Sequence, residues 1–470
     1  MAVNESGNVF SVVQPVFQCY NENEFIESGG MNMQRSKKFW AALIVFSLTG
    51  QIAWVVENMY FNVFIYKMFR ASASDIALMV TASAVAATLT TILIGALSDR
   101  IGRRKIFMCG GYIAWGISII AFSLVRTDVI SSLFGAAVSA ASVGITLVII
   151  LDCVMTFFGS TANDAAYNAW LTDSTDAGNR GAAEGINSMM PLISILVVFG
   201  GFMGFDLDQA SSWTVIYSVI GGLVLLIGVL GFFLVEEAPV RKPDHIGYFA
   251  TILYGFRPVI VRKNKGLYLS MSAFIIFNIA IQIFMPYLII YYEQTLGMTD
   301  YVLIMAPAII LAAAVTFFFG RLVDRFGFRK TVLPSMSLLM IGFILLYLVP
   351  SRIHAEGMAM KLSVFAGSLL MMSGYLSGMA VFGTQIRNCT PEHMAGRFQG
   401  LRIISQVLIP GIVGPQIGAW VLRNAPTVIN SDGTVSFLPS ADIFLAALTV
   451  LVIVFAAVLI VLSHTRKHKG

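Results

Sequence analysis

Three acidic residues stand out because they lie inside long apolar segments. Glu57, Asp152 and Asp164 fall in stretches that otherwise carry few charges. An ionisable side chain at membrane depth is costly, so it normally binds an ion or a solute, or pairs with another helix. We interpret these three acids as candidates for cation coupling. The alternative role for each is a structural pair between helices, and for Glu57 also a position near the membrane surface, close to Lys67.

Polar and aromatic side chains accompany these acids. A hydroxyl-rich solute would be recognised by carboxylate and amide groups, with an aromatic ring against its apolar face. In the first apolar segment the polar positions follow i, i+3, i+6 and i+7, which places them on one helix face. Asn278 and Gln282 add amides in the seventh segment, where interhelical hydrogen bonds are the alternative. The candidate solute-binding residues are Gln51, Trp54, Glu57, Asn58, Asp164, Tyr167, Asn168, Asn278 and Gln282.

The fourth apolar segment is longer and more polar than its neighbours. Residues 127–171 hold more apolar chain than one span needs, so one arrangement is a helix that runs past the bilayer. Two stripes follow helical spacing within it. The first stripe comprises Asp152, Thr156, Asn163 and Tyr167, and the second comprises Asp164 and Asn168.

The elements that must position these residues are membrane-spanning helices. Of the 470 residues, 57% are hydrophobic and only 12% are charged, and the mean hydropathy is +0.81. A soluble domain carries about a quarter charged residues, so this composition excludes an ordinary soluble protein. The net charge of +5 comes from short basic clusters between apolar runs. That pattern is typical of membrane topology and not of a nucleic-acid-binding face.

The hydropathy pattern predicts an all-α membrane protein with twelve transmembrane helices. A spanning helix needs about 20 apolar residues. The predicted spans lie near 39–66, 75–98, 105–126, 135–160, 185–204, 212–235, 268–292, 300–320, 331–350, 360–385, 399–422 and 441–463.

The basic residues predict the orientation. An even number of spans places both termini on one side, and lysine and arginine favour the cytoplasmic side. Of the 30 basic residues, only Lys67, Arg70, Arg126, Arg352, Lys361 and Arg423 lie in the opposite loops. We therefore expect a multi-pass protein of the plasma membrane with both termini in the cytoplasm.

The spans divide the chain into five regions. Two six-helix bundles, 39–235 and 268–463, are expected between cytoplasmic tails at 1–38 and 464–470. The bundles are joined by a polar linker, 236–267, whose aromatic centre suits either a helix on the membrane surface or an ordinary linker.

One loop motif occurs in both halves. The segment from Gly95 to Lys105 reads GALSDRIGRRK, and the segment from Gly320 to Lys330 reads GRLVDRFGFRK. Each follows an even-numbered span at the same place in its half. The glycines permit a tight turn, and an Asp and an Arg can pair at a helix end.

This repeated motif resembles the cytoplasmic loop motif of the major facilitator superfamily. The resemblance covers residues 39–463 and implies two six-helix bundles with a solute cavity between them. It also implies that the motif is a conformational latch between the bundles and not a solute site. The latch residues would be Gly95, Asp99, Arg100, Gly102, Arg103, Arg104, Gly320, Asp324, Arg325, Gly327, Arg329 and Lys330.

A finer resemblance concerns residues 161–180 and 257–265. They are similar to the glycoside–pentoside–hexuronide:cation symporters, of the melibiose-carrier type, and to the sucrose carriers. In that family paired carboxylates of the second helix hold sodium, but Ala87 and Thr91 stand at the corresponding positions here. Met189 and Met190 stand near the family's sugar-binding arginine. The missing carboxylates argue against sodium coupling, so a proton is favoured as the coupling ion, and the missing arginine argues against a melibiose-like sugar clamp.

The leading hypothesis is a secondary active transporter that moves a sugar or glycoside by alternating access in symport with a cation. The alternative is a proton-coupled exporter of amphiphilic compounds. An enzyme is not expected, because the sequence contains no HExxH, nucleophile elbow or P-loop motif. No cofactor and no metal site are expected either. The expected partners are the solute, the coupling cation and the lipid bilayer, with no nucleic acid, and the protein is expected to act as a monomer.

Overall fold

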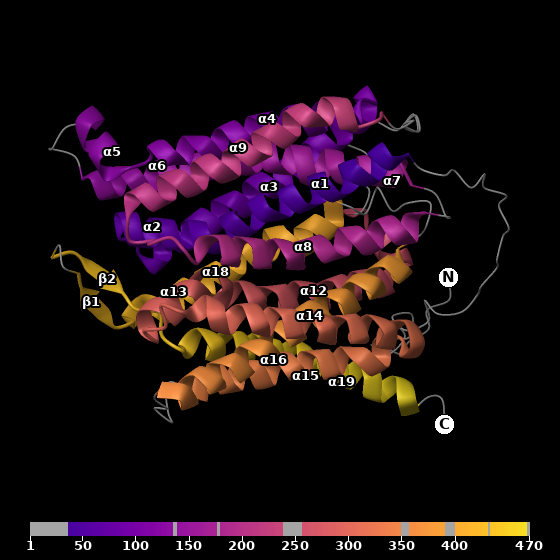
Figure 1. Ribbon diagram of the computed structural model, residues 1–470. Helices are drawn as coiled ribbons and strands as arrows, with labels where there is room; N and C mark the ends of the chain where they lie inside the picture. The colour runs from indigo at the N-terminus through magenta and orange to yellow at the C-terminus, as the bar shows by residue number, and fades with distance from the viewer. Residues whose placement is uncertain are drawn as a thin grey trace.

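The structure is a computed structural model that describes residues 36–134, 139–175, 179–237, 256–348, 357–390, 400–430 and 433–467. Long helices lie side by side in two groups, the indigo-to-magenta helices of the N-terminal half and the orange-to-yellow helices of the C-terminal half (Figure 1). A small hairpin of β1 and β2 projects from one end of the molecule, which we call the hairpin end. We call the other end, where the two copies of the repeated motif lie, the motif end.

The N-terminal half contains six spanning segments, several of them interrupted by π-helical or 3-10 turns. Its elements are α1 (Lys37–Val55), η3 (Val56–Tyr60), α2 (Phe61–Phe69), α3 (Ala73–Ile101), α4 (Arg104–Ala121), η4 (Phe122–Leu124), α5 (Thr127–Phe134), α6 (Ala140–Gly159), η5 (Ser160–Tyr167), α7 (Asn168–Asp173), α8 (Arg180–Phe202) and α9 (Ala210–Leu234).

The C-terminal half repeats this organisation and adds the hairpin between its last two spans. Its elements are α11 (Pro258–Lys263), α12 (Lys265–Phe284), η7 (Met285–Tyr287), α13 (Leu288–Ile290), η8 (Tyr291–Thr295), α14 (Tyr301–Phe326), α15 (Phe328–Leu348), α16 (Gly357–Cys389), η11 (Ile404–Leu408), α18 (Ile409–Val421), η12 (Leu422–Asn424), β1 (Thr427–Ile429), β2 (Val435–Phe437) and α19 (Asp442–Lys467).

Twelve helices within the described residues are long and apolar enough to cross a membrane, which confirms the predicted fold class. The fourth segment differs most from its predicted bounds of 135–160. It runs from Ala140 to Asp173 over 34 residues, because η5 and α7 continue the helix without a break. Many large apolar side chains on the outer faces are exposed, such as Phe233 at 75% and Phe318 at 59%. Such faces suit lipid contact.

Parts of the predicted regions lie outside the described residues. These are most of the tail at 1–38 and residues 238–255 of the linker. The described end of the linker forms the short helix α11.

The two halves contact each other closely toward the hairpin end. In α18 a Cβ on Gly411 would lie 2.5 Å from the Cβ of Ala84 in α3, so the absence of a side chain permits this helix crossing. The Tyr287 hydroxyl donates to the Ala73 carbonyl at 3.0 Å, and the Thr81 hydroxyl donates to the Gly411 carbonyl at 3.3 Å. The Tyr66 hydroxyl of α2 donates to the carbonyl of Phe437 in the hairpin at 2.7 Å.

Glycines also set the packing within each half, and α4 against α9 is the clearest case. A Cβ on Gly116 would lie 2.5 Å from the Leu225 nitrogen and 2.6 Å from the Gly221 carbonyl oxygen. Backbone atoms at this distance cannot rotate away. A side chain at Gly116 must therefore separate the two helices.

We predict that Gly116→Val lowers the stability of the folded protein by about 1–3 kcal/mol, the usual cost of overpacking a close contact. Thermal unfolding of the purified protein in detergent measures the effect. The matched control is Gly110→Val in the same helix, where nothing lies within 4 Å of the added Cβ. Equal unfolding temperatures for the two variants would contradict this account of the α4–α9 contact.

Candidate functional site

A cluster of polar side chains lies inside the N-terminal half around Glu57. Glu57 is on η3, the π-helical turn that joins α1 to α2. Its Oε1 lies 2.8 Å from the hydroxyl of Ser83 in α3 and 2.9 Å from the hydroxyl of Thr156 in α6. The two hydroxyl oxygens are themselves 2.8 Å apart. Three spanning segments thus meet at one carboxyl group.

Asp152 joins this cluster from one turn earlier in α6. It interacts electrostatically with Glu57. Glu57 is 7% exposed and Asp152 is 2% exposed. Glu57 Oε2 and Asp152 Oδ1 have no hydrogen-bond partner among the described residues. Two buried carboxyls with unsatisfied oxygens are costly, so an ion or a ligand is the expected complement.

The fourth span runs antiparallel to the first and packs against it. The stripe of polar residues predicted on the fourth span lies on the side that faces the first span. Asn163 Oδ1 accepts a hydrogen bond from Tyr112 at 3.1 Å and lies where a side chain on Gly50 would be. The Tyr167 hydroxyl donates to Asn187 Oδ1 at 2.9 Å and to the Leu43 carbonyl at 3.4 Å. These two residues therefore face the first span but contribute to helix packing, whereas Asp152 and Thr156 reach Glu57.

Asp164 lies on η5, beside this stripe. Its Oδ2 accepts a hydrogen bond from Ser160 at 3.0 Å, and the carboxyl group is close enough to interact electrostatically with Glu57. Asn168 donates to the backbone carbonyls of Asn163 and Asp164 at 3.2 and 3.1 Å. The Asn168 amide group thus bonds back to the backbone of its own helix, while Asp164 is partly exposed.

The candidates of the first span do not share one environment. Glu57 is buried against α3 and α6, whereas Asn58 is exposed and donates to the Trp54 carbonyl at 2.7 Å. The wider π-helical turn at Val56–Tyr60 changes the angular positions that a regular helix would give. Trp54 packs on Trp115 with ring centroids 5.1 Å apart, and neither indole nitrogen has a hydrogen-bond partner among the described residues. Gln51 is partly buried.

The candidates of the seventh span are less available to a solute. Asn278 is 6% exposed and donates to the Phe274 carbonyl of its own helix at 2.8 Å. Gln282 is partly buried and packs directly against Gly414 of α18. These contacts place both residues in the packing of α12 against its neighbours.

Sequence reasoning missed the ion pair at the hairpin end. Lys67 of α2 pairs with Glu293 on η8 of the C-terminal half, and with Asp208 at 3.2 Å. The Lys67 side chain is only 3% exposed and that of Glu293 is 12% exposed, while Asp208 is 65% exposed. Nearby, the hydroxyls of Tyr60 and Tyr301 are 3.2 Å apart across the halves. A buried cation therefore connects the two halves at this end.

One further ion pair at the hairpin end joins the first turns of α16 to the residue that precedes α14. Lys361 donates to Asp300, and this hydrogen bond holds the pKa of the Asp300 carboxyl below its usual value. Both residues belong to the C-terminal half.

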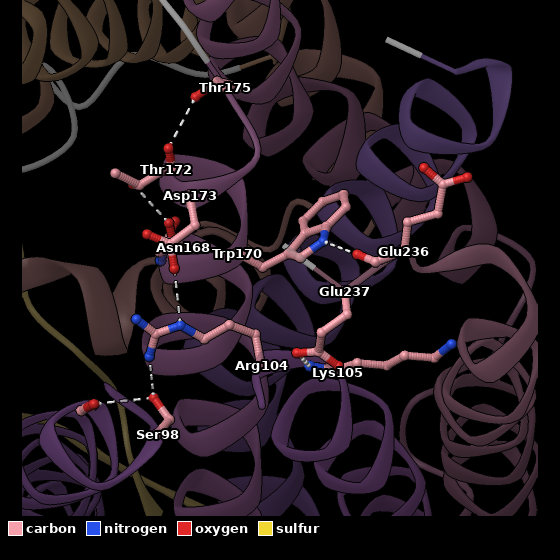
Figure 2. Close-up of polar contacts among 11 residues, drawn as sticks. Ser98, Arg104, Lys105, Asn168, Trp170, Thr172, Asp173, Thr175, Glu236 and Glu237 are labelled. Carbon is pink, nitrogen blue, oxygen red and sulfur yellow. Dashed lines mark hydrogen bonds and ion pairs between the residues drawn. The ribbon is translucent and has the colours of Figure 1, made fainter. Parts of the chain in front are cut away.

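The motif end contains a network around Arg104 of α4 (Figure 2). Arg104 donates to Asp173 Oδ2 at 3.1 Å and to the Ser98 hydroxyl at 2.7 Å. The Lys105 amide donates to Glu237, and the Trp170 indole donates to the Glu236 carbonyl at 2.9 Å. The residues labelled in Figure 2 all belong to the N-terminal half or to the start of the linker that follows it.

Both motif copies place a glycine with positive φ directly after a helix. Gly102 follows α3 with φ of 70° and ψ of 21°, and Gly327 follows α14 with φ of 71° and ψ of 173°. Glycine adopts such positive φ values more readily than other residues. Asp324 and Arg325 are exposed, and the Arg325 guanidinium lies over the Phe326 ring of its own half. A latch between the bundles, expected from the sequence, remains a prediction.

Comparison with solved structures shows shared architecture at low sequence identity. A mutant form of the nucleoside transporter NupG superposes with a TM-score of 0.66 at 12% identity, covering 90% of this chain and 99% of that chain. The inward-open xylose transporter XylE from E. coli gives 0.65 at 13%, covering 90% and 95%. A bacterial homologue of the human lysosomal transporter Spinster, inward-facing and occupied, gives 0.64 at 14%, covering 91% and 97%.

Sequence comparison gives the family. None of the curated protein sequences compared matches the chain significantly. The family model of the Major Facilitator Superfamily matches residues 39–415, which is most of the chain. Together with the twelve helices, this match shows that the chain belongs to the major facilitator superfamily and is a multi-pass membrane transporter.

Proposed function

We propose that this transporter moves a sugar or glycoside by alternating access, in symport with a proton. The observation that carries the proposal is the buried pair of carboxyls, Glu57 and Asp152, with the Ser83 and Thr156 hydroxyls beside them. Two carboxylates in a low-dielectric interior cannot both stay charged without a compensating ion. An ion-binding step is therefore expected in the transport cycle.

The same span connects this site with the closed hairpin end. Glu57 lies on η3, and α2 continues directly from that turn to Tyr66 and Lys67. Tyr66 and Lys67 bind Phe437 and Glu293 of the C-terminal half. A change in the protonation of Glu57 that alters η3 would move α2 and loosen these contacts. This coupling through one helix is the physical link between ion binding and alternating access.

A hydroxyl-rich solute fits the remaining candidate groups. Trp54 offers an indole ring with an unpartnered N–H, and Asp164 offers a partly exposed carboxyl near Glu57. Gln51 and Asn58 lie on the same span as Trp54. Two similar structures belong to a nucleoside transporter and a xylose transporter, whose solutes both carry several hydroxyl groups.

We further propose that the protein lies in the plasma membrane as a functional monomer with cytoplasmic termini. The concentration of basic residues at the motif end supports this orientation. The closed hairpin end would then face outward, and the described conformation would be inward-facing.

We predict that Glu57→Gln abolishes uphill solute accumulation, because the amide cannot exchange a proton, while Asp164→Asn also abolishes it by removing the nearby carboxylate. At least one of the two variants should retain downhill exchange. The measurement is uptake into proteoliposomes with an imposed proton gradient, screened over mono- and disaccharides and nucleosides.

The control for this experiment is Asp128→Asn, which removes an exposed acid remote from Glu57 and paired with Arg126. It should accumulate solute as the unmodified protein does. Normal accumulation by both Glu57→Gln and Asp164→Asn would contradict the assignment. If no solute accumulates and expression instead raises resistance to amphiphilic toxins, the exporter hypothesis replaces the symporter.

We predict that Glu293→Gln shifts the protein toward a conformation open at the hairpin end. The substitution leaves the Lys67 charge without its buried partner, and breaking a buried ion pair costs about 3–5 kcal/mol. Spin labels at Leu124→Cys and Thr299→Cys, on a background without native cysteines, report the distance between the halves. The distance distribution should gain a longer component.

The matched control for this variant is Asp208→Asn. Asp208 is the other partner of Lys67, but it is mostly exposed and belongs to the same half. Exposed ion pairs contribute about 0–1 kcal/mol, so the distance distribution should change little. Identical distributions for Glu293→Gln and the unmodified protein would rule out this ion pair as the hairpin-end gate.

A further inference from the structure

Three oxygen atoms around Glu57 form a closed triangle. Glu57 Oε1 lies 2.8 Å from the Ser83 hydroxyl oxygen and 2.9 Å from that of Thr156. The third side, between the two hydroxyl oxygens, is 2.8 Å. All three separations fall in the range of O–H···O hydrogen bonds. Three such contacts require three protons.

The two hydroxyl groups supply only two of these protons. Each serine or threonine hydroxyl carries one hydrogen, and an ionised carboxylate carries none. If Glu57 were ionised, two oxygens would face each other without a hydrogen between them. One proton on Oε1 completes the ring, with Glu57 donating to Ser83, Ser83 donating to Thr156, and Thr156 donating back to Glu57.

The other oxygen of the carboxyl supports the same assignment. Glu57 Oε2 is buried and has no hydrogen-bond partner among the described residues. An ionised carboxylate would leave charge on this oxygen with no donor, which is far more costly than leaving a neutral carbonyl oxygen unsatisfied. A neutral carboxyl is therefore the form that this environment stabilises.

The surrounding titratable groups disfavour a negative charge on Glu57. Asp152 and Cys153 approach it from α6, and Asp164 approaches it from η5. Tyr217 of α9 faces Asp152. Each of these side chains is neutral when protonated and negatively charged when deprotonated. None of them offers a positive charge to an ionised Glu57.

The size of the triangle disfavours an ion as large as calcium in place of the proton. An octahedral cation with bonds of about 2.3 Å, the lower end for Ca²⁺, holds neighbouring oxygens about 3.3 Å apart. The observed separations of 2.8–2.9 Å are shorter. The hydroxyls are spaced for hydrogen bonds.

We infer that Ser83 and Thr156 form a proton-selective cradle that holds Glu57 in its protonated form in this conformation. Ser83 is a positioning residue, because its hydroxyl contacts both the Glu57 carboxyl and the Thr156 hydroxyl and so orients the proton on Oε1. The inference rests on the proposed function and names the groups that hold the proton at that site. It adds two hydroxyl residues as determinants of ion selectivity.

The test is infrared spectroscopy of the full-length protein in lipid vesicles near neutral pH. A protonated carboxyl gives a C=O stretching band, and the unpartnered Oε2 places this band at the high-frequency, non-hydrogen-bonded end. Glu57→Gln should remove one such band, and Asp128→Asn should leave the spectrum unchanged. An unchanged carboxyl band in Glu57→Gln, or loss of the band on adding sodium, would overturn the inference.

The role of Ser83 is tested by the same band and its pH midpoint. Ser83→Ala opens the ring, so both the band position and the midpoint should shift, and Ser83→Thr should restore them. Thr156→Val should act in the same direction as Ser83→Ala. If Ser83→Ala leaves both quantities unchanged, the hydroxyl does not position the proton. Circular dichroism and the unfolding temperature confirm that each variant is folded.

These spectra separate the inference from the proposed function, because they require no transport. If the Glu57 band is present but Glu57→Gln accumulates solute normally, the proton site stands and the coupling role fails. If Glu57→Gln abolishes accumulation but removes no carboxyl band, the transport role stands and the proton cradle fails.

Discussion

The burial of Glu57 beside Asp152 is the constraint on which the account depends. Two carboxyls inside the N-terminal half cannot both be charged, and the hydroxyls of Ser83 and Thr156 are arranged around one of them. Under the proposed function, this site has two states, with and without its proton. The chemistry of the site and the conformational cycle of the fold can therefore be joined through a single protonation event.

Several of the acidic side chains in this account lie on irregular helical turns. Four π-helical turns occur in the described part of the chain, and three of them carry an acid: Glu57 on η3, Asp164 on η5 and Glu293 on η8. A π-helical turn widens the helix and changes which side chains face inward. Helix α2 connects Glu57 with Glu293. It begins directly after η3, which carries Glu57, and it contains Lys67, which pairs with Glu293. The ion site and the hairpin-end contact thus share a helix.

The fold could be predicted from the sequence because several independent sequence patterns, each spread over many residues, indicate the same arrangement. Apolar runs, basic loops and the repeated motif all favour twelve spans in two halves, and the described part of the chain contains twelve such helices. The fourth span agrees with the extended helix that its excess apolar chain suggests, but its bounds differ from 135–160, because periodicity does not reveal where a π-helical turn continues a helix. For the site, the sequence indicated the three acids but not Ser83, a small residue in a run of alanines and threonines. Nor did it indicate the pairing of Lys67 with Glu293, because residues so far apart meet only through tertiary packing.

The central claim is that a proton bound in the N-terminal half drives solute movement. Solute-induced current across proteoliposomes on a solid support measures this most directly, with sodium absent and pH varied. The account predicts a current in sodium-free buffer that falls as the pH rises and Glu57 loses its proton, and no such current in Glu57→Gln. A current that requires sodium, or one that Glu57→Gln leaves intact, would contradict it.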